Sequence, residues 1–227
     1  MDVDELLGNI AWHSLTGAHA GFAVGRGSVR RYAAGFPPIA AFAEPTRPDF
    51  AELALISASG EPLYVDGWAG AVPDGWVLRA QKTMYRMVWA GEHPAGDEAP
   101  EALPLEKRHT PQALELAAST RPGPFGPRSL ELGEYFGYFE GDRLIAMAGE
   151  RMCAPPLREI SGVCTHPDAR GRGLARRLMM KLVRRLLLRG EQPVLHVMAD
   201  NTGAYDLYCR LGFRVHSEVP ARVISLA

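Results

Sequence analysis

The chain has 227 residues, of which 47% are hydrophobic and 22% charged, and its formal net charge is −1. These are the values of an ordinary globular protein, long enough for one large domain or two small ones. The near-zero net charge excludes a general attraction to nucleic acid or to an anionic membrane, so any basic site must be local. The N-terminus is acidic and no run of about 18 uncharged apolar residues occurs, so neither a signal peptide nor a membrane span is expected.

The cysteine content points to a reducing compartment. Cys153, Cys164 and Cys209 cannot all pair with one another, and their spacing is not that of a metal site. A cytoplasmic protein without a bound metal is therefore expected.

One segment divides the chain. Residues 90–104, "AGEHPAGDEAPEALP", are rich in proline, glycine, alanine and acid, and this composition predicts a linker. It separates an N-terminal α/β region, 1–95, from a C-terminal domain, 103–227, both of ordinary domain size. In the first part a short amphipathic helix is predicted over 47–57, and we find no motif that carries chemistry there. Strands are predicted there over 62–68 and 75–89.

The C-terminal part has clearer periodicity. The apolar stripe of a long helix is spaced at i, i+4, i+8 and i+12, and a hairpin turn is expected at Gly141. The predicted order, β-α-β-β-β-α-β-α-β, is an α/β arrangement with a mixed sheet. The elements are a helix over 110–120, a hairpin over 134–152, a strand over 158–165, the long helix over 172–189, a buried parallel strand over 193–199, a short helix over 202–212, and one or two closing strands over 213–227.

A glycine-rich turn stands between the strand at 158–165 and the long helix. Residues 165–190 hold three glycines and eight basic residues, with no acid after Asp168. The free N–H groups and the dipole at a helix N-terminus favour an anion, which makes this a typical context for binding phosphate. Gly171 and Gly173 let the backbone approach a phosphate closely, and Arg170 and Arg172 add positive charge.

Three phosphate-binding motifs compete for this turn. A P-loop is excluded because no GxxxxGK[ST] string occurs. A dinucleotide fingerprint fails at its third position, which is Arg176, and the acid it needs is replaced by Glu191 in a loop. The third motif fits: residues 170–175, "RGRGLA", resemble the (Q/R)-x-x-G-x-(G/A) coenzyme A signature of the GNAT superfamily of N-acetyltransferases.

The resemblance extends over roughly residues 105–227. Residues 199–215, "ADNTGAYDLYCRLGFRV", resemble the superfamily ending N-x-x-A-x-x-x-Y-x-x-x-G-F. The implied fold is the GNAT (acyl-CoA N-acyltransferase) fold, a mixed and mostly antiparallel sheet flanked by helices. The smaller N-terminal α/β region resembles a degenerate half of the same fold, as found in one subgroup.

The resemblance also implies an activity, the direct transfer of an acetyl group from acetyl-CoA to a primary amine. In the superfamily, strands four and five part, partly because of a bulge in strand four, and pantetheine lies in the gap. Residues expected to hold the coenzyme are Val163, Cys164 and Thr165 by backbone pairing, Arg170, Gly171, Arg172, Gly173, Leu174 and Ala175 around the pyrophosphate, and Asn201.

The same resemblance assigns the chemistry. Tyr208 is expected to protonate the leaving thiolate, and a backbone N–H near Val163 or Cys164 to stabilise the developing oxyanion. Glu159 is the first candidate for the general base, acting directly or through a water molecule, and Glu150 is the second. Neither a role for His166 nor an acyl-enzyme at Cys164 is expected.

Other interpretations remain open at this point. The arginines of the long helix are either a solvated face or, at Arg176 and Arg177, contacts to the coenzyme 3′-phosphate. A sensor that binds acyl-CoA without transfer is an alternative, and a nucleic-acid-binding module is a weaker one. The expected acceptor is a small-molecule or peptide amine bound near the loop 119–135, which carries Arg121, Phe125 and Arg128. Membrane binding is not expected, and a homodimer is left open.

Overall fold

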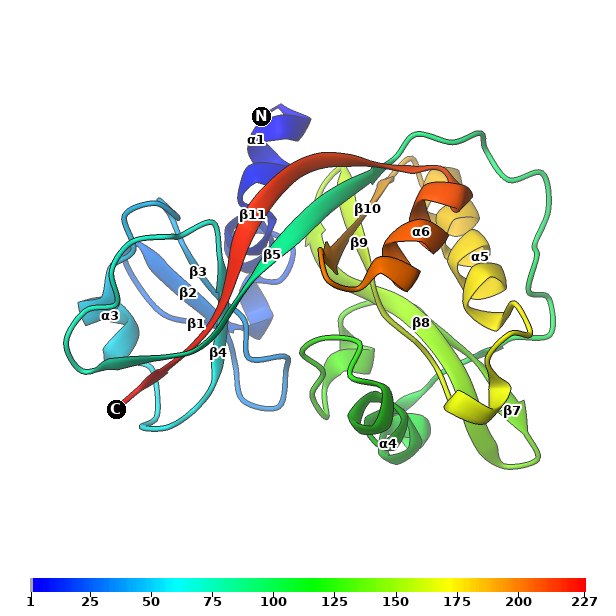
Figure 1. Ribbon diagram of the computed structural model, residues 1–227, viewed down its shortest axis with the longest axis horizontal. Helices are drawn as coiled ribbons and strands as arrows, with labels where there is room; N and C mark the ends of the chain where they lie inside the picture. The colour runs from blue at the N-terminus through cyan, green and yellow to red at the C-terminus, as the bar shows by residue number, and fades with distance from the viewer. Residues whose placement is uncertain (1) are drawn as a thin grey trace.

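A computed structural model describes residues 2–227, and its main feature is a mixed eight-stranded sheet in the order β4-β11-β5-β10-β9-β8-β7-β6 (Figure 1). Every neighbouring pair in this sheet is antiparallel except β9 with β10. The strands are β4 (Leu63–Asp66), β5 (Trp76–Trp89), β6 (Leu103–Pro104), β7 (Tyr135–Glu140), β8 (Arg143–Ala154), β9 (Leu157–Thr165), β10 (Gln192–Met198) and β11 (Phe213–Leu226). A smaller antiparallel sheet contains β1 (Ala23–Val24), β2 (Val29–Tyr32) and β3 (Ala40–Phe42).

Helices cover both faces of the large sheet. On one face, α5 (Leu174–Leu188) and α6 (Thr202–Leu211) pack on apolar side chains that include Ile160 and Val197. On the other face, α1 (Val3–Gly8) and α2 (Ile10–Thr16) pack near Met152 and Leu157, and α4 (Thr110–Thr120) packs on β8 and β9. A short α3 (Phe50–Ala54) belongs to the N-terminal part, and 3-10 turns span Ala20–Phe22, Lys107–His109, Ser129–Glu131 and Pro167–Ala169.

The long helix follows its predicted stripe. Leu178, Met179, Leu182, Val183 and Leu186 are all fully buried in the core beneath the helix. The predicted mixed sheet with helices on its faces is thereby confirmed.

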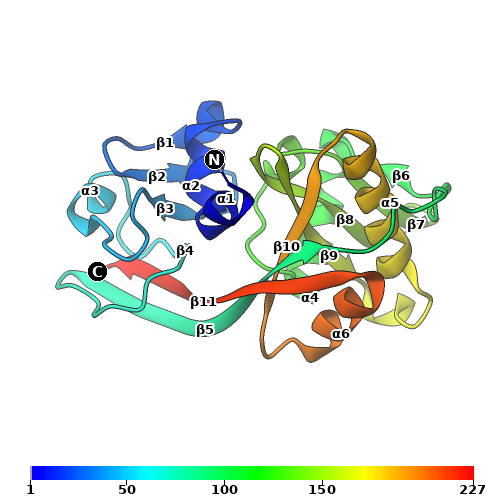
Figure 2. The same ribbon diagram turned by 90° about the horizontal axis from the view of Figure 1, so that it is seen from above.

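The two parts of the chain share one sheet. β5, from the N-terminal part, lies between β10 and β11, with Met87 opposite Leu195 on one side and Trp89 opposite Phe213 on the other. β11 is a single strand of 14 residues with a bulge between Val215 and Ser217, and it continues into the N-terminal part to pair with β4. Figure 2 shows this β5–β11 ribbon running between the two parts.

Two features of the strands differ from expectation. The strand predicted to be parallel within 193–199 pairs in parallel with β9 over three residue pairs only, and its other edge is antiparallel to β5. The helices α1 and α2 were not predicted, because their apolar residues are spread over two short segments instead of one periodic run.

The segment 90–104 has little regular structure, yet it is attached to α5. Ala99 and Ala102 are buried, and the carbonyl of Ala99 accepts a hydrogen bond of 3.1 Å from Lys181 Nζ. The carbonyl of Glu98 accepts one of 2.8 Å from Arg177 Nε. The segment 90–104 is therefore bound to α5 by hydrogen bonds and buried side chains.

Candidate functional site: a cavity between two parted strands

The site begins where β9 and β10 separate. Their parallel pairing is confined to residues 157–159 and 192–194, and beyond these residues the strands part. β9 carries a bulge there. Ser161 of β9 stands opposite Gly149 of β8, and Cys164 opposite Met147, so β9 has one residue more than β8 between these two pairs. Gly162 lies within this bulge at φ +63, a backbone conformation that favours glycine.

A cavity of about 360 Å³ occupies this region. Its walls include Ile160, Val197 and Tyr208, which belong to the core under α5 and α6, and also Ile39 and Met152, which belong to the core under α1 and α2. Because side chains from both faces line it, the cavity reaches across the sheet at the point where β9 and β10 part.

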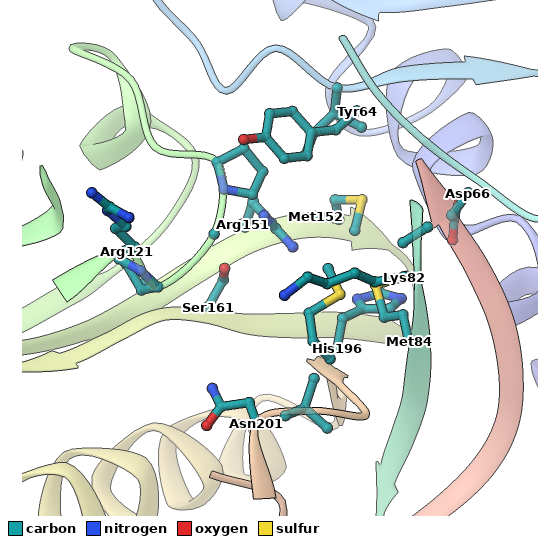
Figure 3. A pocket seen from close by; sticks show the side chains of 18 of the residues that line it. Tyr64, Asp66, Lys82, Met84, Arg121, Arg151, Met152, Ser161, His196 and Asn201 are labelled. Atoms are coloured by element: carbon teal, nitrogen blue, oxygen red, sulfur yellow. The ribbon is translucent and has the colours of Figure 1, made fainter. Parts of the chain in front are cut away.

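The N-terminal part of the chain supplies much of the outer wall. Figure 3 shows Tyr64, Asp66, Lys82 and Met84 beside the cavity. Lys82 Nζ donates a hydrogen bond of 2.5 Å to Asp200, and Asp66 accepts one of 2.6 Å from Arg86, so neither charge is free. Sequence reasoning left the role of this region open; in the structure it closes one side of the site.

The glycine-rich turn leads from the end of β9 to the start of α5. Gly171 and Gly173 have φ angles of +76 and +74, and a Cβ at either position would meet no atom within 4 Å. The glycines are therefore required by the backbone conformation and not by a crowded neighbour. Gly173 is the N-cap and contributes no side-chain cap, so the N–H groups from Gly173 to Arg176 have no intrahelical acceptor. An open, glycine-lined helix N-terminus of this kind fits a diphosphate.

The arginines around this turn differ in their partners. Arg170 is exposed, whereas Arg172 pairs with Glu140, Arg176 with Glu98 and Arg177 with Glu101. Further along α5, Arg185 and Arg189 pair with Glu134. The basic face predicted to be solvated is thus largely neutralised by acidic side chains, several of them from the segment 90–104.

Tyr208 and Asn201 both line the cavity from α6. Tyr208 is 8% exposed, and burial raises its pKa to about 12, so its phenol is protonated at neutral pH. Asn201 is the N-cap of α6, and its Oδ1 accepts a hydrogen bond of 3.3 Å from the Ala204 N–H. Its side-chain NH₂ remains available to the cavity.

The three residues expected to pair with pantetheine lie along the parted edge of β9. Val163 lines the cavity. Cys164 is buried among apolar residues that include Met147, and burial raises the pKa of its thiol to about 12. A thiol held protonated in this way is a poor nucleophile, which agrees with the expectation of no acyl-enzyme. Thr165 ends the strand, and its hydroxyl is buried without a hydrogen-bond partner among residues 2–227.

Glu159 is not placed as a direct base would be. Its side chain is fully buried, and its carboxylate accepts hydrogen bonds of 2.8 and 2.5 Å from Arg151 and one of 2.7 Å from His196. Burial raises the pKa of Glu159, but Arg151 and His196 outweigh this effect and hold its pKa well below its usual range. A carboxylate that is so weakly basic, and separated from the cavity by its partners, does not fit direct proton removal from an amine.

Glu150, the second candidate base, also lies away from the cavity. It is 2% exposed and pairs with Arg189 at 2.6 Å and Arg158 at 3.6 Å. His166 caps the turn before Gly171 by accepting a hydrogen bond of 3.3 Å from the Asp168 N–H, which is a structural role.

The loop predicted to bind the acceptor is only partly at the cavity. Arg121, Pro122, Gly123 and Pro124 line it, and Arg121 ends α4 in the left-handed conformation, at φ +52. Arg128 instead pairs with Glu131 at 2.7 Å and stacks on Phe36. Phe125 packs edge-on against Tyr135.

Sequence reasoning missed His196 and Arg151. His196 lines the cavity from β10, and its partner Glu159 is the residue to which Arg151 binds. The only signal for His196 was one polar residue inside the apolar strand "PVLHVMA". Arg151 stands in β8, where every residue after Arg143 is buried, so its charge required a buried partner.

Within residues 2–227, no cluster of His, Cys, Asp and Glu is arranged to hold a metal ion. No helix in the same range has the length and apolar character needed to cross a membrane.

Comparisons with known proteins agree on the fold. The family model described as FR47-like protein matches residues 135–222. A structure assigned to the GNAT family of acetyltransferases, from Novosphingobium aromaticivorans DSM 12444, is 33% identical, with a TM-score of 0.89 and 100% coverage of both chains. No curated protein matches the sequence.

More distant structures share the fold alone. A GCN5-related N-acetyltransferase-like protein from Streptococcus suis 89/1591 is 18% identical, with a TM-score of 0.62 and coverage of 96% of this chain and 92% of that one. A GCN5-related N-acetyltransferase from Kribbella flavida is 19% identical, with a TM-score of 0.57 and coverage of 95% and 93%. The parted strands, the glycine turn and the full-length similarity at 33% identity lead to one assignment. The chain belongs to the GNAT superfamily of N-acetyltransferases.

Proposed function

We propose that this protein transfers an acetyl group from acetyl-CoA to a primary amine of a small molecule or peptide. The observation that carries the proposal is the cavity across the β9–β10 gap, which has Tyr208 on one side and the N-terminal part of the chain on the other. A thioester and an amine approaching from opposite faces of the sheet would meet there.

The chain's own groups fit the coenzyme. The main chain of Val163, Cys164 and Thr165 runs along the parted edge of β9, where an extended pantetheine arm can pair as an added strand. The N–H of Arg170 donates to the Pro167 carbonyl, so the open N–H groups from Gly171 through Ala175 would hold the pyrophosphate. Asn201 would contact the arm from α6. When bound, acetyl-CoA supplies the activated acetyl group.

The chemistry follows from the same residues. A main-chain N–H at Val163 or Cys164 would donate a hydrogen bond to the thioester oxygen as negative charge develops on it. Tyr208, protonated at neutral pH, would donate its hydroxyl proton to the departing sulfur.

The lining of the cavity favours an acceptor with an apolar body. Apolar side chains from the N-terminal part and from β8 line it, among them Ile39, Met84 and Met152. Arg121 is the charged residue of the acceptor loop at the cavity, and it would attract a carboxylate on the acceptor.

Two other functions are less well supported. A nucleic-acid-binding module would need an open basic face, but four of the five cations of α5 pair with Asp97, Glu98, Glu101 and Glu134. A sensor that binds acyl-CoA without transferring the acyl group would not need a protonated phenol inside the cavity. The transfer assay below decides between sensor and enzyme.

Titration calorimetry with acetyl-CoA tests the proposal. Gly173→Glu places a carboxylate at the pyrophosphate site and is expected to abolish binding. Gly190→Glu is its matched control, because Gly190 follows the same helix at φ +73 and also has no neighbour within 4 Å of a Cβ. Loss of binding in the first variant only, followed by release of free thiol with a panel of primary amines, supports the enzyme. If a folded wild-type protein does not bind acetyl-CoA, the proposal is wrong.

A further inference from the structure

Three ionisable side chains form a buried chain of contacts at the parted strands. Arg151 of β8 donates two hydrogen bonds to Glu159 of β9, at 2.8 and 2.5 Å. On its other side, Glu159 lies 2.7 Å from Nδ1 of His196 on β10. The side chains of Arg151, Glu159 and His196 are 10%, 1% and 5% exposed, so this arrangement is fixed by its surroundings.

The ionisation of the Glu159 carboxylate determines which ring nitrogen of His196 carries the hydrogen. Arg151 and His196 outweigh the effect of burial and keep the pKa of Glu159 low, so this carboxylate is ionised and can only accept hydrogen bonds. The 2.7 Å contact therefore requires a hydrogen on Nδ1 of His196. In a neutral imidazole, this leaves the lone pair on Nε2.

Nε2 of His196 has no hydrogen-bond partner within residues 2–227. Among the residues that the structure describes, it is buried and makes no hydrogen bond, although His196 lines the cavity (Figure 3). An unsatisfied buried nitrogen is costly in a folded protein, and such a group calls for a ligand or a role. Here the basic nitrogen belongs to a residue in the wall of the cavity where the amine is proposed to bind.

We propose that His196 is the general base of the reaction and that Glu159 is the residue that positions it. The inference rests on the proposed function. It replaces direct proton removal by Glu159 with removal by His196 Nε2, and it gives Arg151 the role of holding Glu159 ionised and in place.

The protons balance as follows. An ammonium acceptor loses two protons as its nitrogen becomes an amide nitrogen. One passes to His196 Nε2 and then to water, and the other, through Tyr208, ends on the sulfur. The new C–N bond forms as the C–S bond breaks, so the products are the acetamide, the free thiol and one released proton.

Charged groups surround His196 on several strands. Arg86 of β5 is its register partner and pairs with Asp66 of β4. Lys82 of β5 and Asp66 line the same cavity.

The first test needs no acceptor. Nitrogen NMR of protein labelled at its seven histidines, with His196 identified by its absence from His196→Asn, reports which ring nitrogen carries the hydrogen. The Nδ1–H tautomer is expected in the wild type. The Nε2–H tautomer would overturn the proposal, whether or not any amine is acetylated.

The second test is kinetic. In His196→Asn the amide can still donate to Glu159 but offers no basic nitrogen, so acetyl-CoA binding should persist while kcat falls about 10²- to 10⁴-fold with an alkyl amine. With methoxyamine, whose amino group is already unprotonated at neutral pH, the loss should be much smaller. His196→Gln provides a second variant should the first not fold.

His216→Asn is the matched control. His216 also contacts a carboxylate, Asp4 at 2.8 Å, but it lies outside the cavity, so its rates should be unchanged. An equal loss with alkyl amine and methoxyamine in His196→Asn would make His196 a structural residue and overturn the proposal. If the wild type binds no acetyl-CoA, the proposed function fails, and the tautomer still tests the Glu159–His196 pair separately.

Discussion

Trp89 and Phe213 stand opposite each other on β5 and β11, with their rings edge to face and the ring centroids 5.2 Å apart. Trp89 comes from the N-terminal part and Phe213 from the C-terminal part, and both are buried in the core under α5 and α6. The core of the coenzyme-binding half is therefore completed by a side chain from the other half.

This relationship predicts the behaviour of fragments. Residues 103–227 expressed alone lack β5, which leaves facing edges of β10 and β11 unpaired and Phe213 exposed. We expect that fragment to aggregate and to become soluble when it is co-expressed with residues 1–95. Size-exclusion chromatography of the two preparations measures the outcome. A monomeric, cooperatively folding 103–227 fragment would show that the half is independent of β5.

A second prediction concerns the segment 90–104 and its attachment to α5. Lys181 is buried and donates hydrogen bonds to Asp97 and to the Ala99 carbonyl, so Lys181→Met leaves both acceptors without their donor. We expect a loss of about 1–3 kcal/mol in the free energy of unfolding and faster proteolysis within 90–104. Denaturant titration measures the first effect, and limited digestion with a protease that cleaves after glutamate measures the second, since the segment contains Glu92, Glu98 and Glu101.

Arg176→Met is the control for that variant. Arg176 pairs with Glu98 at the surface, where an ion pair contributes little, so stability and proteolysis should stay near wild type. Equal effects in the two variants would mean that general charge, and not the buried contact of Lys181, holds the segment.

Much of the C-terminal half was predictable because its signals are local. The stripe of α5 and the glycines at 171 and 173 repeat at fixed spacing, and the structure places the helix at Leu174–Leu188 where 172–189 was predicted. The insertion of β5 between β10 and β11 was not predictable, because strand order depends on contacts between residues more than a hundred positions apart.

In the candidate site too, some features have a local sequence signal and others depend on contacts between distant residues. Tyr208 and the glycine turn belong to sequence motifs, and Tyr208 lines the cavity. The role of Glu159 depended on what surrounds it in space. Its partners Arg151 and His196 come from two other strands, and no spacing in the sequence joins the three residues.

A third prediction is the pH dependence of stability that Glu159 produces. Its pKa is lower in the folded protein than in the unfolded chain, so the stabilisation is complete above the unfolded value, about 4.3, and is lost as the pH falls toward the folded value. Thermal unfolding of the wild type should show Tm falling steeply below about pH 4.3.

In Glu159→Gln, the fall of Tm with decreasing pH should be less steep than in the wild type. At neutral pH the substitution leaves the buried Arg151 without its counter-charge, at a cost of about 3–5 kcal/mol. Glu131→Gln, which breaks an exposed pair with Arg128, should leave Tm and its pH dependence almost unchanged. Parallel Tm–pH curves for the wild type and Glu159→Gln would contradict this assignment.

The last prediction concerns the proton donor. Tyr208→Phe removes the one hydroxyl on α6 that lines the cavity among residues 2–227 and keeps the ring that packs against Phe213. Folding and acetyl-CoA binding should be retained, while kcat falls about 10²- to 10⁴-fold because the thiolate must leave without a positioned acid. Tyr205→Phe, one turn earlier on α6 and outside the cavity, should keep wild-type rates.

The pH profile separates an acid from a packing residue. Because burial raises the pKa of Tyr208 to about 12, its ionisation should not lower the wild-type rate below about pH 10. A donor thioester whose thiol has a low pKa needs little protonation as it leaves, so it should recover much of the rate of Tyr208→Phe. If that thioester is slowed as much as acetyl-CoA is, the hydroxyl of Tyr208 acts on binding geometry and not on the leaving sulfur.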